Sequence, residues 1–127
     1  MLALMATDIS SPSTAISGAT TSIPSQFAAD PVKLLIAIAD PIRWAVLREL
    51  AAGPPRSVLE LAARVRHSDN LVSKHLHWLR EAGAVVVLPM PGTDQRISHY
   101  GIPPEYLRQN AAGKMEIDYG VCVLRFP

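Results

Sequence analysis

The sequence predicts a mainly α-helical fold with one small antiparallel β-hairpin, which places it in the α+β class. Three observations predict this fold. Four stretches between residues 30 and 82 combine helix-start signals with apolar residues at helical spacing, a β-branched run follows Gly83, and a turn rich in Pro and Gly follows that run. With 127 residues, 49% of them hydrophobic, the chain suits one small domain with a single core.

The beginning of the chain differs from the rest in composition. Residues 1–25 are rich in Ser, Thr, Ala and Pro and carry one charged side chain, Asp8, so we predict a disordered tail. We expect the helical domain over residues 26–104 and a C-terminal extension over residues 105–127.

Two Asp-Pro pairs predict the first two helices, because Asp caps a helix start and Pro suits the first helical position. Asp30-Pro31 starts the first helix and Asp40-Pro41 the second. An apolar stripe at helical spacing follows the first pair: Val32, Leu35, Ile36 and Ala39. A second amphipathic set follows the other pair and stops at Gly53-Pro54: Ile42, Val46, Leu47 and Leu50.

Two serines predict the next two helices. Ser57 and Glu60 form a capping-box pattern at the start of a helix over residues 57–65. Ser68 caps a helix over residues 69–82, which stops at Gly83. The buried stripe predicted for this fourth helix consists of Val72, Leu76 and Leu79.

The spacing of apolar residues changes after Gly83. Residues 84–88 read as a strand, residues 89–95 as a turn and residues 96–102 as a returning strand. This pattern predicts a hairpin with a long tip, and Pro103-Pro104 closes the unit.

The two short helices over residues 57–65 and 69–82 are joined by a three-residue turn, which is the pattern of a helix-turn-helix. In such a motif the start of the second helix lies in the major groove of DNA. Off the predicted buried stripe, this helix carries the polar residues Asn70, Ser73, Lys74 and His77. Basic residues that flank it and suit phosphate contacts are Arg64, Arg66 and Arg80.

Charge distribution agrees with this interpretation. Between residues 41 and 80 the chain has seven basic and three acidic side chains, although its formal net charge is only +1. A local basic excess is typical of a surface that meets phosphates, and a solvated helical face is the other explanation for it.

Five segments in this order resemble the ArsR-type winged helix-turn-helix repressors: AIADPIR (37–43), VLREL (46–50), SVLELA (57–62), VSKHL (72–76) and LREAG (79–83). The resemblance covers residues 30–102. It implies a dimeric repressor that binds a pseudo-palindromic operator and leaves it when an inducer binds. By position it implies base contacts from Asp69, Asn70, Ser73 and Lys74, and a phosphate contact from the wing near Arg96.

The chain departs from the family pattern at two places. Arg66-His67 stands where the family turn usually has a small and then an apolar residue, so His67 either packs in the turn or adds a phosphate contact. Asp69 stands where an uncharged polar residue is common. Its carboxylate favours the helix dipole but repels phosphate, and it is also able to accept a hydrogen bond from a cytosine amino group.

No metal, cofactor or catalytic constellation is predicted within one chain. His75 and His77 are two positions apart on a helix and point about 200° apart, so they do not chelate one ion together. The single cysteine, Cys122, excludes an internal disulfide and a thiolate cluster. A metal site between subunits and a thiol switch at Cys122 stay open. We interpret Trp44 and Trp78 as partly buried, and His75 as packing beside Leu76 and Leu79.

The segment over residues 115–126 is β-prone, where family members often end in a helix used for dimerisation. It is apolar on both faces from Val121 onward, which favours burial on both sides. Two arrangements stay open: a strand added to the wing sheet, or a strand paired with a second chain. The dimer interface is therefore open between the helix over residues 31–39 and this strand.

The sequence thus predicts a regulator that is not an enzyme and that binds double-stranded DNA as a homodimer. The longest apolar runs are far shorter than the ~20 residues of a membrane span, so we expect no membrane association and a cytoplasmic protein. The alternative is a winged-helix protein-interaction module that does not bind DNA. The operator and the inducer are not predicted.

Overall fold

Four α-helices make up the first half of the described chain, and each begins at a side chain that caps it. The structure is a computed structural model that describes residues 30–127; the tail predicted over residues 1–25 lies outside the described residues. The helices are α3 (Pro31–Ile38), α4 (Pro41–Ala52), α5 (Val58–Val65) and α6 (Asp69–Glu81). The caps are those predicted, and each accepts from a backbone N–H of the first turn: Asp30, Asp40, Ser57 and Ser68.

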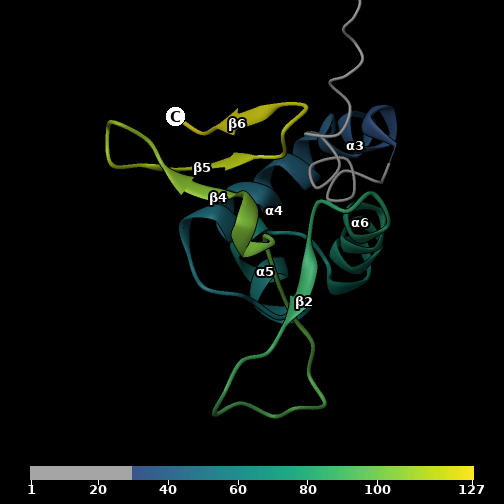
Figure 1. Ribbon diagram of the computed structural model, residues 1–127. Coiled ribbons are helices and arrows are strands. Elements are labelled where there is room, and N and C mark those ends of the chain that lie inside the picture. The colour runs from purple at the N-terminus through teal and green to yellow at the C-terminus, as the bar shows by residue number, and fades with distance from the viewer. Residues whose placement is uncertain (1–29) are drawn as a thin grey trace, which may run out of the picture.

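The predicted hairpin follows α6 directly. Gly83 ends the helix with φ 81°, the left-handed conformation that glycine adopts without strain. Strand β2 (Val86–Leu88) pairs antiparallel with β3 (His99–Gly101). The second strand is shorter than the predicted 96–102, so its first residues belong to the tip. Figure 1 shows this tip extending away from the helices.

Backbone hydrogen bonds hold the base of the hairpin in place, and a glycine there leaves room for a neighbouring side chain. Arg56 and Tyr100 exchange backbone hydrogen bonds of 2.9 and 2.7 Å, which attaches the segment before α5 to the hairpin. At Gly101, a Cβ atom would lie only 2.7 Å from Leu88 Cδ1, and glycine avoids this close approach.

The predicted class, mainly α with a small antiparallel hairpin, is confirmed.

The core lies where the helices meet the base of the hairpin. The stripe predicted for α6 is confirmed, because Val72, Leu76 and Leu79 are at most 1% exposed. These side chains pack with buried residues of α4 and α5: Val46, Leu47, Leu50, Leu61 and Ala62. Burial of this one stripe sets which face of α6 remains outside.

The stripe predicted on α3 faces solvent. Val32, Leu35 and Ile36 are 61%, 46% and 59% exposed, and Ala39 is exposed too. The buried residues of α3 are Leu34, Ala37 and Ile38. This helix is apolar on both faces, so the spacing alone did not reveal which face the rest of the chain covers.

The C-terminal extension forms a sheet of its own, so the first of the two open arrangements, a strand added to the wing sheet, is wrong. After the short 3₁₀ helix η3 (Pro104–Tyr106) come β4 (Leu107–Gln109), β5 (Met115–Asp118) and β6 (Val123–Arg125). They form an antiparallel sheet in the order β4-β5-β6. Burial on both faces is also wrong, because Val121 and Val123 are exposed while Leu124 is buried.

Aromatic side chains dock this sheet on the helices, beside α4 in Figure 1. Tyr119 is buried and its hydroxyl donates a 2.8 Å hydrogen bond to the carbonyl of Ala84, at the start of the hairpin. Tyr106 meets the Tyr119 ring edge-on, with ring centroids 5.3 Å apart. Trp44 of α4, half-buried as predicted, packs on Phe126 at 4.8 Å.

Over residues 30–127, none of the helices is long and apolar enough to span a bilayer.

Candidate nucleic-acid interface

The turn between α5 and α6 sets the geometry of the site. The predicted three-residue turn is confirmed, since α5 ends at Val65 and α6 begins at Asp69. Arg66 takes the left-handed conformation with φ 62°, and its N–H bonds the carbonyl of Ala62. A β-carbon makes this conformation unfavourable, so the flanking helices must hold it. Both helices pack against α4, which provides that support.

The exposed face of α6 carries the polar residues that the sequence singled out. Asn70, Ser73, Lys74 and His77 are all exposed, and their spacing places them on one helical face. Asp69 is exposed in the first turn beside them. Because the buried stripe fixes the orientation of α6, this face points away from the core. The structure therefore brings five of the predicted site residues together on one element.

The basic residues around this face differ in how free they are. Among residues 30–127, no carboxylate lies within ion-pair distance of Arg66, Lys74 or Arg80. Arg64 is different, because its Nε lies 2.5 Å from Glu49 Oε1 on α4. That pair leaves Arg64 less available for a phosphate than the sequence indicated.

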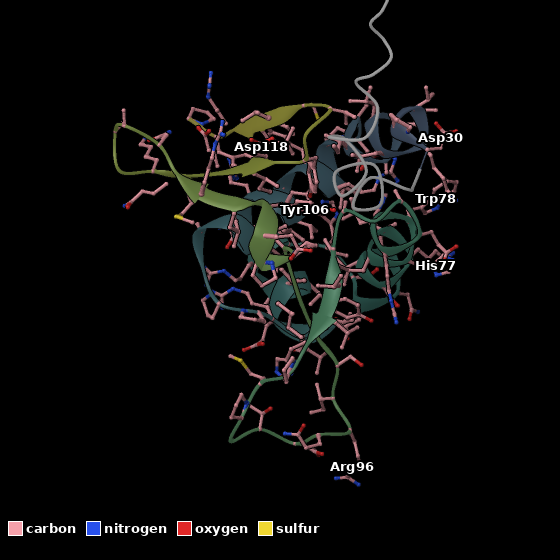
Figure 2. All side chains as sticks on the ribbon, in the orientation of Figure 1. Asp30, His77, Trp78, Arg96, Tyr106 and Asp118 are labelled. Carbon is pink, nitrogen blue, oxygen red and sulfur yellow. The ribbon has the colours of Figure 1, made fainter. Side chains whose placement is uncertain are left out.

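Arg96 lies at the tip of the hairpin, well away from α6 (Figure 2). Its side chain is exposed and forms a two-point ion pair with Asp94, in which Nε lies 3.1 Å from Oδ1 and Nη2 lies 2.9 Å from Oδ2. Asp94 also accepts from the Arg96 backbone N–H at 2.9 Å. These hydrogen bonds lower the pKa of the Asp94 carboxyl, so it is ionised at neutral pH and offsets part of the charge on Arg96.

Behind the exposed face, His75 connects α6 to the start of α4. Its Nδ1 lies 3.1 Å from Arg43 Nη1 and 3.8 Å from Asp40 Oδ2. The sequence predicted only that His75 packs beside Leu76 and Leu79, and these polar contacts were not predicted. Burial lowers the pKa of the imidazole, although the nearby Asp40 carboxylate opposes this. The neutral ring is thus able to accept the hydrogen bond from the guanidinium of Arg43.

Trp78 is more exposed than predicted, at 53%. The guanidinium carbon of Arg43 lies 5.7 Å from its ring centroid, a cation–π distance. His77 and Trp78 lie side by side on the outer surface of α6 in Figure 2. With Lys33 and Glu81 they line a shallow pocket of about 230 Å³ between α6 and α3.

No group of three or more His, Cys, Asp or Glu side chains is placed to hold a metal ion within residues 30–127. Cys122 is half-buried, and burial raises the pKa of its thiol. The thiolate, which reacts with oxidants, is therefore disfavoured.

Three contacts of the site were not predicted from the sequence. The Asp94–Arg96 pair had a local signal, because an Asp in a turn often accepts from the backbone two residues on. The Glu49–Arg64 and Arg43–His75 contacts join residues 15 and 32 positions apart and had no such signal.

Comparisons with known proteins locate the same region. Residues 38–87 match the model of a helix-turn-helix domain. No curated protein matches the sequence. An ArsR-like transcriptional regulator from Rhodococcus sp. RHA1 is 25% identical with a TM-score of 0.50, over 66% of this chain and 71% of that chain.

Two further solved structures are similar. The transcriptional regulator HlyU from Vibrio vulnificus is 30% identical, over 65% of this chain and 81% of that chain, with a TM-score of 0.48. A homodimeric winged helix-turn-helix DNA-binding domain from Mycobacterium bovis is 23% identical, over 68% of this chain and 71% of that chain, with a TM-score of 0.49.

Proposed function

We propose that this chain, which belongs to the ArsR family of winged helix-turn-helix transcriptional regulators, is a dimeric repressor. It would recognise a specific DNA sequence through α6. The observation that carries the proposal is the division of α6 into two faces. One face is fully buried and fixes the helix, while the other presents short polar side chains from its first two turns. A recognition helix needs both properties.

The proposed contacts follow from the position of each side chain. Asp69, Asn70, Ser73 and Lys74 lie on the first two turns of α6 and are assigned to base edges. Arg66 in the turn and Arg96 on the wing are assigned to phosphates, which would position the protein on the duplex. His77 lies furthest along the exposed face and is assigned to the margin of the interface.

We assign the dimer interface to α3. Its exposed Val32, Leu35 and Ile36 form an apolar surface that is unusual for a monomer, and the half-exposed Trp78 lies on the neighbouring helix α6. The C-terminal sheet offers a weaker alternative at its edge strand β6, where Val123 is exposed.

The two interfaces are separated by a matched pair of variants. We expect Ile36→Glu to convert the dimer into a monomer, because a charge would be buried against an apolar partner. Val123→Glu places the same charge on the edge strand and should leave the dimer intact. Light scattering after gel filtration measures both, and the opposite result would move the interface to β6.

DNA recognition is tested by fluorescence anisotropy with DNA from upstream of the protein's own gene and a scrambled control. We expect preferential binding to the upstream DNA at physiological salt. Asn70→Ala should reduce that preference by about tenfold, since a good base contact contributes about 1–3 kcal/mol of discrimination. An equal loss of affinity for the upstream and the scrambled DNA would show that Asn70 does not contact bases. Weak, salt-insensitive binding to all fragments tried would favour the protein-interaction module.

The proposed repressor acts in the cytoplasm and holds no metal within one protomer. Elemental analysis of the purified protein tests the second statement. A stoichiometric metal that leaves on chelation and changes DNA affinity would contradict it.

A further inference from the structure

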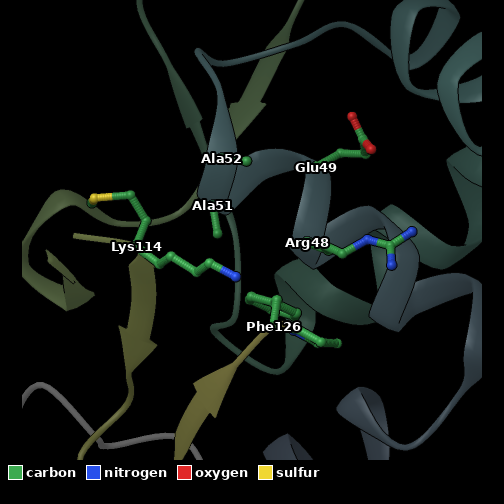
Figure 3. A pocket seen from close by; sticks show the side chains of 8 residues that line it. Arg48, Glu49, Ala51, Ala52, Lys114 and Phe126 are labelled. Carbon is green, nitrogen blue, oxygen red and sulfur yellow. The ribbon is translucent and has the colours of Figure 1, made fainter. Parts of the chain in front are cut away.

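A second pocket lies where the C-terminal extension meets α4 (Figure 3). Its volume is about 430 Å³, within the range of small-molecule sites. The helix contributes Arg48, Ala51 and Ala52, and the C-terminal extension contributes Lys114, Met115, Phe126 and Pro127. One wall is therefore the C-terminal extension, which lies outside the matched helix-turn-helix domain.

The lining combines an apolar surface with positive charge. Phe126 is held against Trp44, so its ring is a fixed part of the wall. Figure 3 shows the side chains of Lys114 and Arg48 on opposite sides of this ring. Both are exposed, and within the described residues neither has a carboxylate at ion-pair distance.

The pocket also has one acidic residue, Glu49, whose carboxylate is already bound to Arg64. The accessible side-chain charge is thus positive beside an aromatic and aliphatic surface. We propose that this pocket binds a small organic anion with a flat apolar body, such as an aromatic carboxylate. The anion would meet Lys114 and Arg48, and the apolar body would pack on Phe126 and the two alanines.

The same geometry connects the pocket to the DNA-binding motif. Glu49 lines the pocket and holds Arg64, which lies on α5, the first helix of the motif. A ligand against this part of α4 would alter the position of Glu49 and the support it gives to α5. On the proposed function, such a ligand would act as an effector of DNA binding.

The site is tested without DNA, so its failure is distinct from failure of the proposed function. The probe is 2-naphthoate, and its neutral control is 2-naphthalenemethanol, which has the same ring system. Amide shifts of the full chain in ¹⁵N NMR spectra should move around Ala52 and Lys114, with the neutral compound binding at least tenfold more weakly, as expected for lost charged hydrogen bonds. Equal affinities, or shifts confined to α3 and Trp78, would overturn the proposal.

Charge variants sharpen the test. Lys114→Met and Arg48→Met should each weaken 2-naphthoate binding by about tenfold. Arg80→Met removes an exposed cation on α6, outside the pocket, and should leave the affinity unchanged. If all three variants lose affinity equally, the attraction is a general charge effect and the pocket is not the site.

The regulatory part has its own measurement. Saturating 2-naphthoate should change the affinity of the wild-type protein for its upstream DNA, and the Lys114→Met variant should need about tenfold more ligand for the same change. Binding in the pocket with no change in DNA affinity would overturn the effector role alone.

Discussion

Basic side chains are held in opposite ways in the C-terminal sheet and in the helix-turn-helix. In the sheet, Arg108 contacts Glu116 and Asp118 at 2.6 and 2.7 Å, and Arg125 contacts Glu116 at 3.2 Å. In the motif, Arg66 and Lys74 extend into solvent without such partners among the described residues.

This difference in pairing distinguishes cations that stabilise the fold from cations that are available to a ligand. Glu116 is buried, and its hydrogen bond from Arg108 lowers the pKa of its carboxyl, so the arginines of the sheet neutralise a buried anion. A cation without a carboxylate partner keeps its charge for an incoming phosphate. Arg96, held by the exposed Asp94, lies between the two cases.

The largest expected effect comes from removing the free cations of the motif. The double variant Arg66→Met, Lys74→Met should weaken DNA binding by about a hundredfold and lower the slope of log K against log salt by about one, because Arg66 loses a phosphate contact and Lys74 a base contact. Anisotropy titrations at several salt concentrations measure both. Arg108→Met is the matched control: it should lower the melting temperature and leave the salt slope unchanged. An altered slope in Arg108→Met would end the distinction between the regions.

A smaller effect is expected where the two regions are joined. Tyr119→Phe removes the hydroxyl that donates to the Ala84 carbonyl and leaves that buried acceptor without its partner. We expect a loss of about 1–3 kcal/mol in the free energy of unfolding. Urea denaturation measures it. A wild-type midpoint would mean that the aromatic packing alone docks the sheet.

The smallest effect concerns the intermediate case on the wing. Asp94→Asn keeps an acceptor for the turn but removes the negative charge beside Arg96. DNA binding should tighten about threefold, and the salt slope should become steeper, because Arg96 no longer shares its charge with Asp94 and pairs more fully with a phosphate. The same substitution combined with Arg96→Met should give no gain, and a gain in that double variant would exclude Arg96 as the cause.

Local signals made the helices predictable. Caps, Asp-Pro pairs and the buried stripe of α6 all act within a few residues, so the sequence shows them directly. Once Val72, Leu76 and Leu79 are recognised as the buried stripe, the opposite face of α6 is predicted to be exposed. On α3 both faces are apolar, and periodicity does not say whether Val32 and Ile36 are covered by their own chain.

The C-terminal sheet was harder to predict, because its signals in the sequence are weak. Its strands are only three or four residues long, too short for a clear alternation of apolar and polar residues. The turn between β4 and β5 is set by Asn110, whose Oδ1 accepts from Ala112 and Lys114, and by Gly113 with φ 81°. That turn pairs β4 with β5 in a separate sheet, so the wing sheet gains no strand.

The caps at Asp30, Asp40, Ser57 and Ser68 have a consequence for how the chain folds. Each cap contributes about 1 kcal/mol within a single turn of helix, before any distant contact has formed. Contacts between sequence neighbours form fast, whereas the Tyr119–Ala84 contact must close a separation of 35 residues. In refolding, the helices should therefore acquire their structure ahead of the C-terminal sheet, and the sheet should close last over an already assembled DNA-binding unit.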